Sequence, residues 1–292
     1  MDRRDAAKRP AGTSLAVTYE GGDTALYDRI ARFVDYLEIS PDSISRATDA
    51  GSEIDRETLA ELVEIGGDKQ FLIHGVGLSI ASADGWSEDY LRLLDTLFEH
   101  LPVAWHSEHL AYTMVGGQQL GTMLPPPRSQ EALDLICERV QQMRRRYPVP
   151  FALEHVVRVL PDYPGTYSDA DFLNALTREA GCEFIVDAYN LVCDRQNFAF
   201  DAEGFLAELD LTRAREMHVA GGGVHRGFRM DSHSRRADGE TRTLAASILA
   251  RAPNLRAVTF EFLKEAVPSL GADAICAELA ALKEMLVHAE PR

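Results

Sequence analysis

Cysteine is scarce in this 292-residue sequence, and its four copies stand alone. Cys137, Cys182, Cys193 and Cys276 lie far apart, and no two of them form a CxxC pair. Zinc–thiolate sites and iron–sulfur clusters need several cysteines at short, regular spacing, so both kinds of site are excluded. Scattered cysteines among apolar residues indicate reduced, structural thiols, and we therefore expect a cytoplasmic protein.

Long apolar runs and an excess of positive charge are also missing. No stretch reaches the roughly 18 apolar residues of a membrane span. The polar, basic segment Met1–Gly12 has no hydrophobic centre, so we expect a flexible tail rather than a secretory signal. With 46 acidic and 30 basic residues, the chain carries a formal charge of -16. This charge repels nucleic-acid backbones and anionic membranes, and we predict neither as a partner.

The alternation of short apolar runs with amphipathic helical stretches predicts the fold. No GxGxxG or Walker loop follows the first apolar run, which disfavours a nucleotide-binding open sheet. Helical spacing of apolar residues marks Glu88–His100, Gln130–Tyr147, Asp169–Gly181 and Asp273–His288. Strands are expected at Leu15–Tyr19, Tyr36–Ile39, Phe71–Gly75, Ala104–His109, Phe151–His155, Phe184–Asp187, Arg215–Val219 and Ala257–Phe262. Eight β/α units in a chain of this length predict one (β/α)8 barrel, a TIM barrel, with residues 13–292 as a single catalytic domain.

Histidines and carboxylates stand at the ends of six consecutive predicted strands. They are His74 in FLIHG, His109 in WHSEHL, Glu154 in FALEH, Asp187 in FIVDAYN, His218 in EMHVAGGG and Glu261 in VTFEF. In a (β/α)8 barrel the carboxyl ends of the strands meet at one rim, where active sites lie. The loop after the seventh strand adds Asp231 and His233 in the motif DSH, whose spacing lets both side chains reach one ion.

Carboxylates gathered at one buried rim need compensating charge, because desolvation and mutual repulsion both disfavour their ionised forms. Basic side chains are nearly absent from these strand ends, so we expect metal cations there. The eight candidate ligands exceed the roughly four to six that one transition ion takes, and two or three ions bridged by carboxylates fit their number. Imidazole and carboxylate donors leave iron, manganese and zinc open, and with them oxidation, hydrolysis and isomerisation.

Other polar residues near the predicted rim are expected to support these ligands. His106 alternates away from His109 along its strand and is expected to face the helices. If His218 points into the barrel, then Glu216 does too, and that carboxylate needs a bulge or a buried partner. Supporting roles behind the ligands are predicted for four residues: Glu108, His155, Asn190 and His225.

At these residues the sequence resembles the multinuclear non-heme iron-dependent oxidative enzymes, the MbnB-like family within the xylose-isomerase-like TIM barrels. The resemblance runs from about Leu15 to Pro268. It rests on HGVGLSIAS from His74, SEHL at His109, LEH at Glu154, DAYN at Asp187, HVAG at His218, DSH at Asp231–His233 and the strand of Glu261.

Three departures from the family pattern are visible. His155 stands where the family usually has asparagine, and Gly222 in HVAGG replaces a second histidine. The final segment reads EFLKEAVP from Glu261, where the family usually has an aspartate close behind the glutamate. We expect these departures to affect the substrate pocket and the exact reaction more than the metal core.

The resemblance implies a specific activity. It implies two or three iron ions in mixed Fe2+/Fe3+ states, with dioxygen as co-substrate. One iron would bind a residue of a ribosomally made precursor peptide, in particular a cysteine thiolate, and another would bind dioxygen. Glu154, Asp187 and His218 would be catalytic as well as metal-binding. The resemblance also implies a small separate partner protein that captures the leader peptide, since no such module is visible in this chain.

Two other functions stay open. The first is a divalent-metal isomerase or hydrolase of the xylose-isomerase-like class, which would place His, Glu and Asp at the same rim. Its DNA-acting branch is disfavoured by the negative charge, and an isomerase would need a sugar-handling lysine, for which Lys264 is the candidate. The second is a non-catalytic scaffold subunit, which would load iron without consuming oxygen.

Overall fold

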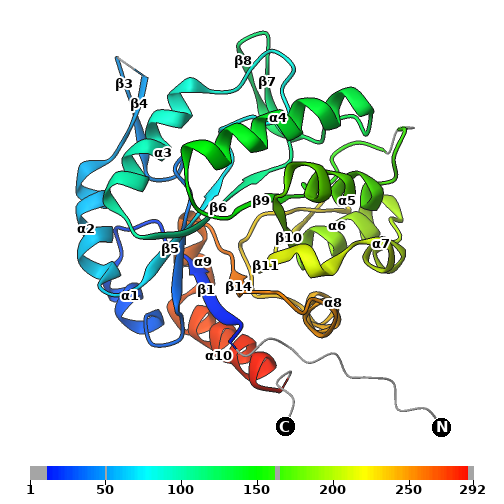
Figure 1. Ribbon diagram of the computed structural model, residues 1–292. Coiled ribbons are helices and arrows are strands. Elements are labelled where there is room, and N and C mark those ends of the chain that lie inside the picture. The colour runs from blue at the N-terminus through cyan, green and yellow to red at the C-terminus, as the bar shows by residue number, and fades with distance from the viewer. Residues whose placement is uncertain (1–11, 50, 162–164, 289–292) are drawn as a thin grey trace, which may run out of the picture.

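Eight parallel strands close into a barrel, and helices surround it (Figure 1). The computed structural model describes residues 12–49, 51–161 and 165–288. Around the barrel the strands follow the order β1, β14, β11, β10, β9, β6, β5 and β2, and neighbouring strands are parallel. The predicted (β/α)8 fold is therefore confirmed. The expected tail, Met1–Gly12, lies outside the described residues except for Gly12.

The barrel strands lie close to their predicted positions, and their side chains alternate between two environments. Phe71 and Ile73 of β5 join the hydrophobic core outside the barrel, whereas Leu72 packs with Trp105 in a small cluster inside it. This period of two also turns His74 inward. The strands are β1 (Ser14–Thr18), β2 (Tyr36–Ile39), β5 (Gln70–Gly75), β6 (Val103–His109), β9 (Phe151–Glu154), β10 (Glu183–Asp187), β11 (Ala214–Val219) and β14 (Ala257–Phe260).

Three of the longer helices begin at serine caps. Ser87, Ser129 and Ser168 accept hydrogen bonds from the backbone N–H groups that open α3, α4 and α5. No described helix is both long and apolar enough to cross a membrane. The helices are α1 (Thr24–Ile30), α2 (Arg56–Gly66), α3 (Glu88–His100), α4 (Gln130–Arg146), α5 (Asp169–Ala180), α6 (Ala188–Phe198), α7 (Ala202–Glu208), α8 (Gly239–Arg251), α9 (Val267–Leu270) and α10 (Ala272–His288), with the 3-10 turns η1 (Leu211–Arg213) and η2 (Lys264–Ala266).

Three hairpins lie in loops that follow barrel strands. They pair β3 (Ser45–Thr48) with β4 (Gly51–Ile54), β7 (Tyr112–Val115) with β8 (Gln118–Leu124), and β12 (Val224–His225) with β13 (Phe228–Arg229). Two of them, β3 with β4 and β7 with β8, are labelled in Figure 1. Because each hairpin follows the carboxyl end of a barrel strand, all three stand on the face where the ligand residues were predicted.

The deepest carboxylate in the barrel, Glu216, has buried partners. Trp105 Nε1 donates to Glu216 Oε2 at 2.7 Å, and the hydroxyl of Thr259 donates to Oε1. A register shift between β10 and β11 occurs beside it, between Phe184 and Ile185. Glu216 therefore does share the inner face with His218, and two neighbouring strands supply the donors that its burial requires.

One buried carboxylate fastens the last helix to the loop after β13. Glu278 of α10 is fully buried, and its Oε2 accepts hydrogen bonds from Arg236 at 2.6 Å and from Arg242 at 2.5 Å. The two guanidinium side chains remain 39% and 37% exposed, so they keep contact with water while the carboxylate does not. This clamp joins α10 to Arg236, three residues after the DSH motif, and to Arg242 in α8.

Replacing Glu278 with glutamine is expected to lower the free energy of unfolding by about 1–2 kcal/mol, because a buried neutral amide cannot replace a carboxylate between two guanidiniums. The expected loss is smaller than for a fully buried ion pair, since both arginine side chains remain in contact with water after the carboxylate is removed. Urea unfolding measures the change. Glu284→Gln, at an exposed position of the same helix, is the control and should change stability by less than about 0.5 kcal/mol. Equal stability of the two variants would contradict the clamp.

Candidate metal centre

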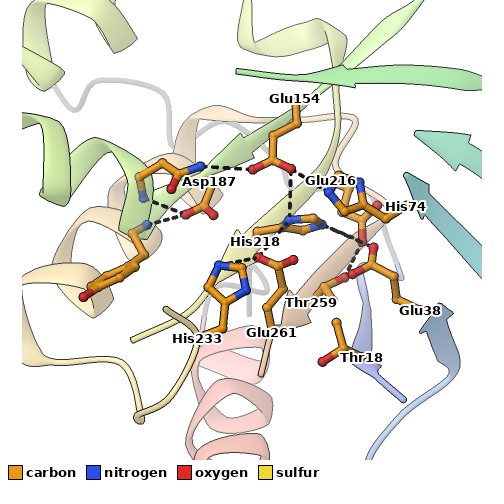
Figure 2. A network of polar contacts seen from close by, with 12 residues as sticks. Thr18, Glu38, His74, Glu154, Asp187, Glu216, His218, His233, Thr259 and Glu261 are labelled. Carbon is orange, nitrogen blue, oxygen red and sulfur yellow. Dashed lines mark hydrogen bonds and ion pairs between the residues drawn. The ribbon is translucent and has the colours of Figure 1, made fainter. Parts of the chain in front are cut away.

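The strand ends bring the predicted histidines and carboxylates together at the C-terminal mouth of the barrel (Figure 2). His74 and Glu154 come from β5 and β9, Asp187 and His218 from β10 and β11, and Glu261 directly follows β14. None of these five residues is more than 6% exposed. Six strands thus contribute to one buried polar cluster, because His109 at the end of β6 adjoins it.

Hydrogen bonds determine which ring nitrogen His74 and His109 present to the cluster. Nδ1 of His109 lies 2.8 Å from the carbonyl oxygen of Gly75, which can only accept, so Nδ1 carries the proton. Nδ1 of His74 lies 2.9 Å from the hydroxyl of Ser107, whose own hydrogen is donated to the carbonyl of Ile73 at 3.2 Å. Burial lowers the pKa of both rings, which favours the neutral form, and in these tautomers of that form Nε2 is the nitrogen without a proton.

Both bare nitrogens face the same carboxylate oxygen. Nε2 of His74 lies 2.9 Å from Glu154 Oε2, and Nε2 of His109 lies 3.6 Å from the same oxygen. Lone pairs at these distances repel unless a proton or a cation lies between them. Burial raises the pKa of Glu154 well above its usual range, because an ionised carboxylate is unfavourable away from water. Three ligand atoms around one point suit a metal cation.

His218 lies between carboxylates at the centre of the cluster. Its Nδ1 is 3.1 Å from Glu261 Oε2, and its Nε2 is 3.3 Å from Glu38 Oε2. Burial alone would lower the pKa of His218, but the charges of Glu261, Glu38 and Glu154 together outweigh it and hold the pKa well above the usual range. The ring is therefore either the cation that neutralises these carboxylates or a ligand of the cation that does so.

A second group of ligands joins the end of β10 to the DSH motif. Asp187 caps α6, since its Oδ1 accepts from the N–H groups of Tyr189 at 2.5 Å and Asn190 at 2.9 Å. Within the described part of the chain, its Oδ2 has no hydrogen-bond partner. Burial raises the pKa of Asp187 to about 7. Asp231 Oδ1 and His233 Nε2 lie 2.7 Å apart and complete this group.

Backbone contacts hold the loop that carries the DSH motif. His233 adopts a left-handed φ of 44°, and its carbonyl accepts from the N–H of Leu263 at 3.2 Å. Gly222 passes so close to the loop that an added Cβ would collide with the carbonyl of Met230 and lie 2.7 Å from the hydroxyl of Tyr189. The glycine that replaces the family's second histidine is therefore required by the path of this loop.

The ligand atoms form overlapping groups that fit metal ions. Four groups of three atoms gather within 4.8 Å: Glu38, His74 and His218; His74, His109 and Glu154; Glu154, Asp187 and His218; and Asp187, Asp231 and His233. Among the described residues, the atoms buried without a hydrogen-bond partner include His74 Nε2, Glu154 Oε2, both ring nitrogens of His218, His233 Nε2 and Glu261 Oε2. Such atoms are unfavourable unless something binds them. The residues present therefore fit a metal centre of imidazole and carboxylate ligands.

Glu38 is the member of this cluster that the sequence analysis missed. It is 1% exposed, and burial raises its pKa to about 8. The signal was available, because Leu37 and Ile39 on either side belong to the outer hydrophobic core and alternation along β2 turns Glu38 inward. The residue escaped notice because ligands were expected only from the third strand onward.

The four residues expected to support the ligands fall in different places. Asn190 Nδ2 donates to Glu154 Oε1 at 3.2 Å, as a supporting residue should. The ring of His155 turns outward to Phe205, 5.7 Å away, and His225 is exposed in the hairpin of β12 and β13. Glu108 also faces outward, 2.7 Å from Nε2 of His106, because residues two apart on β6 share a side. The predicted support from the side chains of Glu108, His155 and His225 is therefore corrected, whereas the outward position of His106 is as predicted.

Replacing Ser107 with alanine is expected to weaken metal binding about tenfold or more, because the hydroxyl fixes the ring of His74 with Nε2 toward the cluster. A competition titration of ferrous iron against a chromophoric chelator under anaerobic conditions measures the affinity. Ser82 is an equally buried serine whose hydroxyl donates to the carbonyl of Met114, away from the ligands. Ser82→Ala should bind iron like the unaltered chain, and equal loss in both variants would refute the orienting role.

Glu38→Gln is expected to weaken iron binding by about tenfold to a hundredfold, since a neutral amide replaces a carboxylate that can ionise beside His218 when a cation binds. The same iron titration, followed by metal analysis after gel filtration, provides the measurement. Asp194→Asn alters another buried carboxylate, one that pairs with Arg158 outside the ligand groups, and is the matched control. Unchanged iron affinity in Glu38→Gln would remove this residue from the centre.

Comparison with known proteins shows the family of the chain. Residues 21–286 match the family described as RiPP precursor modification enzyme MbnB/TglH/ChrH. A UPF0276 protein of Anaeromyxobacter sp. (strain Fw109-5) is 28% identical over 207 residues, which cover 70% of this chain and 73% of that protein. A UPF0276 protein of Caulobacter vibrioides is 31% identical over 196 residues, which cover 66% of this chain and 70% of it. A second Caulobacter vibrioides relative, 30% identical, is matched over only 58% of its length and 55% of this chain.

Solved structures with the same fold are more distant. The D-psicose 3-epimerase of Clostridium cellulolyticum H10 has a TM-score of 0.58 and 13% identity, over 95% of this chain and 100% of its own. Endonuclease IV of Thermus thermophilus has a TM-score of 0.56 and 16% identity, over 94% of this chain and 99% of its own. At such identities the likeness shows the barrel fold alone. The match over residues 21–286 shows that this chain belongs to the RiPP precursor modification enzymes of the MbnB/TglH/ChrH family.

Proposed function

We propose that this chain is a multinuclear non-heme iron enzyme that uses dioxygen to oxidise a residue, in particular a cysteine, of a ribosomally synthesised precursor peptide. The observation that carries the proposal is the convergence of bare histidine nitrogens on a shared carboxylate, His74 and His109 on Glu154. Membership of a family of peptide-modifying enzymes supports the substrate class. A ligand set of imidazoles and carboxylates without thiolate suits redox-active iron.

Two or three ions are proposed from the way the ligand groups overlap. One ion would be held by His74, His109 and Glu154, and another by Asp187, Asp231 and His233. His218, with Glu261 and Glu38 on its two sides, lies between these groups and would serve a third ion or bridge the first two. Because neighbouring groups share ligands, the ions would be coupled, which agrees with a mixed Fe2+/Fe3+ centre.

When bound, the iron ions would supply the electrons for dioxygen and the positive charge that lets a substrate thiol lose its proton at neutral pH. The chain's own residues would position the reactants. Ser107 and the carbonyl of Gly75 hold His74 and His109 in the tautomer that ligates through Nε2. Asn190 orients Glu154, and the first turn of α6 orients Asp187. Glu154, Asp187 and His218 are proposed as catalytic because they lie where the groups overlap.

The proposed partners follow from the family. The substrate would be a precursor peptide whose modified residue enters the mouth of the barrel, between the hairpins that stand on this face. A small separate protein that holds the leader peptide would deliver it.

The isomerase alternative lacks its expected lysine at the cluster. Lys264 lies in η2, where its Nζ sits beside Gly22, and its charge acts on Glu20. Hydrolases can also use two metal ions, so the number of ligand groups does not separate the two functions. Membership of a family of peptide-modifying enzymes makes oxidation of a peptide the stronger proposal.

Elemental analysis and Mössbauer spectroscopy of 57Fe-labelled protein, purified without chelator, test the proposed chemistry. Two or more irons in a coupled mixed-valence state, together with oxygen consumption on addition of a peptide encoded beside this gene, would support it. Zinc or manganese alone, with no reaction toward oxygen after reconstitution with iron, would favour the hydrolase or isomerase. Full iron loading without oxygen consumption with any peptide would favour a scaffold.

His109→Ala and Asp187→Ala are each expected to lose at least one of the bound irons and to abolish oxygen consumption, because each removes a ligand from a different group. Iron per chain is measured by mass spectrometry after desalting. His225→Ala, at an exposed histidine of the hairpin, is the control and should retain full iron. Equal iron in all three variants would defeat the ligand assignment.

A further inference from the structure

The opposite end of the barrel, at the amino ends of the strands, carries a groove walled by arginines. Two hollows of about 910 and 350 Å3 share the residues Glu183, Arg213 and Arg215 and therefore form one continuous depression. Its guanidinium groups come from the last turns of α4 and α5, from η1, from β11 and from the residue before β14. We call this depression the arginine groove; its arginines are Arg144, Arg145, Arg178, Arg213, Arg215 and Arg256.

The arginine groove is positive although the chain as a whole is negative. Three carboxylates line it, Glu179, Glu183 and Asp210, so six positive groups face three negative ones and leave a local charge of about +3. The whole chain carries -16. Asp210 is already engaged, because its Oδ1 accepts from the N–H and the hydroxyl of Thr212 at 3.2 and 2.6 Å.

Among the described residues, two of these six arginines pair with a carboxylate. Glu183 pairs with Arg215 at 2.5 Å, and Glu179 lies 3.3 Å from Arg178. Four exposed arginines of the groove make no ion pair within 4.0 Å to any described residue: Arg145, Arg213, Arg256 and Arg144. Of these, Arg144 is held by the backbone, because its Nη1 donates to the carbonyl of Ala180 at 2.9 Å. Arg145 lies at the carboxyl end of α4, where the helix dipole favours a cation. No helix dipole accounts for the cation at Arg256, because this residue directly precedes strand β14.

The apolar residues that line the groove also suit a peptide. Pro148, Val149 and Pro150, with Phe151 at the start of β9, line the larger hollow between the arginines. Apolar and proline residues there give a bound backbone and its methylene groups a surface to pack on, while the surrounding guanidiniums present planar forks that match carboxylates. The combination is typical of recognition of acidic peptides.

We propose that the arginine groove binds an acidic segment of a partner polypeptide, whose carboxylates pair with Arg145, Arg213 and Arg256. The proposal goes beyond the oxidation proposed above and does not rest on it, because the groove lies at the other end of the barrel from the ligands. A short acidic segment fits better than a nucleic acid. Screening limits the positive field to about 8 Å in physiological salt, so a long polyanion would run onto the acidic surface beyond the groove.

Fluorescence anisotropy of a fluorescein-labelled octaglutamate peptide, titrated with the full-length protein at low salt, tests the proposal. We expect saturable binding that weakens as salt is added. Arg213→Glu/Arg256→Glu should weaken it about tenfold or more, since two attractive charges become repulsive. Arg32→Glu/Arg56→Glu changes the net charge equally at two exposed arginines outside the groove, and this control should bind like the unaltered chain.

The milder variant Arg213→Gln/Arg256→Gln guards against misfolding, and thermal unfolding followed by circular dichroism checks all variants. An intermediate loss of affinity in this variant, with unchanged unfolding, would support the groove as the binding site. Absence of saturable binding, equal weakening in the control variant, or stronger binding of an oligonucleotide or of inorganic phosphate than of octaglutamate would each overturn the proposal.

Discussion

The crowding of carboxylates at the mouth of the barrel is the constraint on which the rest of this structure depends. Glu38, Glu154, Asp187 and Glu261 lie together with almost no contact with water. Burial raises the pKa of the first three, whereas the charges of His218 and His233 outweigh burial and lower the pKa of Glu261. A cluster held only by histidine cations would be fragile, because each imidazolium is itself buried. Metal ions would relieve both costs at once, and they would explain why the bare nitrogens of His74 and His109 point at an anion.

The strands that carry the ligands also carry their supports. His109 is oriented by the carbonyl of Gly75, and a Cβ at Gly75 would collide with Tyr90 and with Glu108 on the outer side of the barrel. Glycine is therefore needed at position 75, where Tyr90 and Glu108 come closest to the backbone of β5. The inner network of Trp105, Thr259 and Glu216 underlies His218 in the same way.

Much of this arrangement was predictable, and the rest depended on register. The barrel and the six ligand-bearing strand ends follow from periodicity and from residue type, because parallel strands in a closed barrel must end at one rim. Glu38 had the same signal, but a single carboxylate in a short strand stands out only once its neighbours are known. The prediction for Glu108 was wrong because neighbouring residues of a strand point to opposite sides, and His109 already points inward. The prediction for His225 was wrong because the path of a loop cannot be derived from its composition. The partners of Glu216 could not be predicted, because the sequence does not say which residues of β6 and β14 lie beside it.

Anomalous diffraction from crystals grown with iron, recorded on both sides of the iron absorption edge, tests the central claim most directly. The account predicts at least two peaks inside the mouth of the barrel, one among His74, His109 and Glu154 and one among Asp187, Asp231 and His233. A metal-loaded protein with peaks elsewhere, or with no anomalous signal among these residues, would contradict it. In that case His218, as a buried imidazolium, would be the cation around which the carboxylates are arranged.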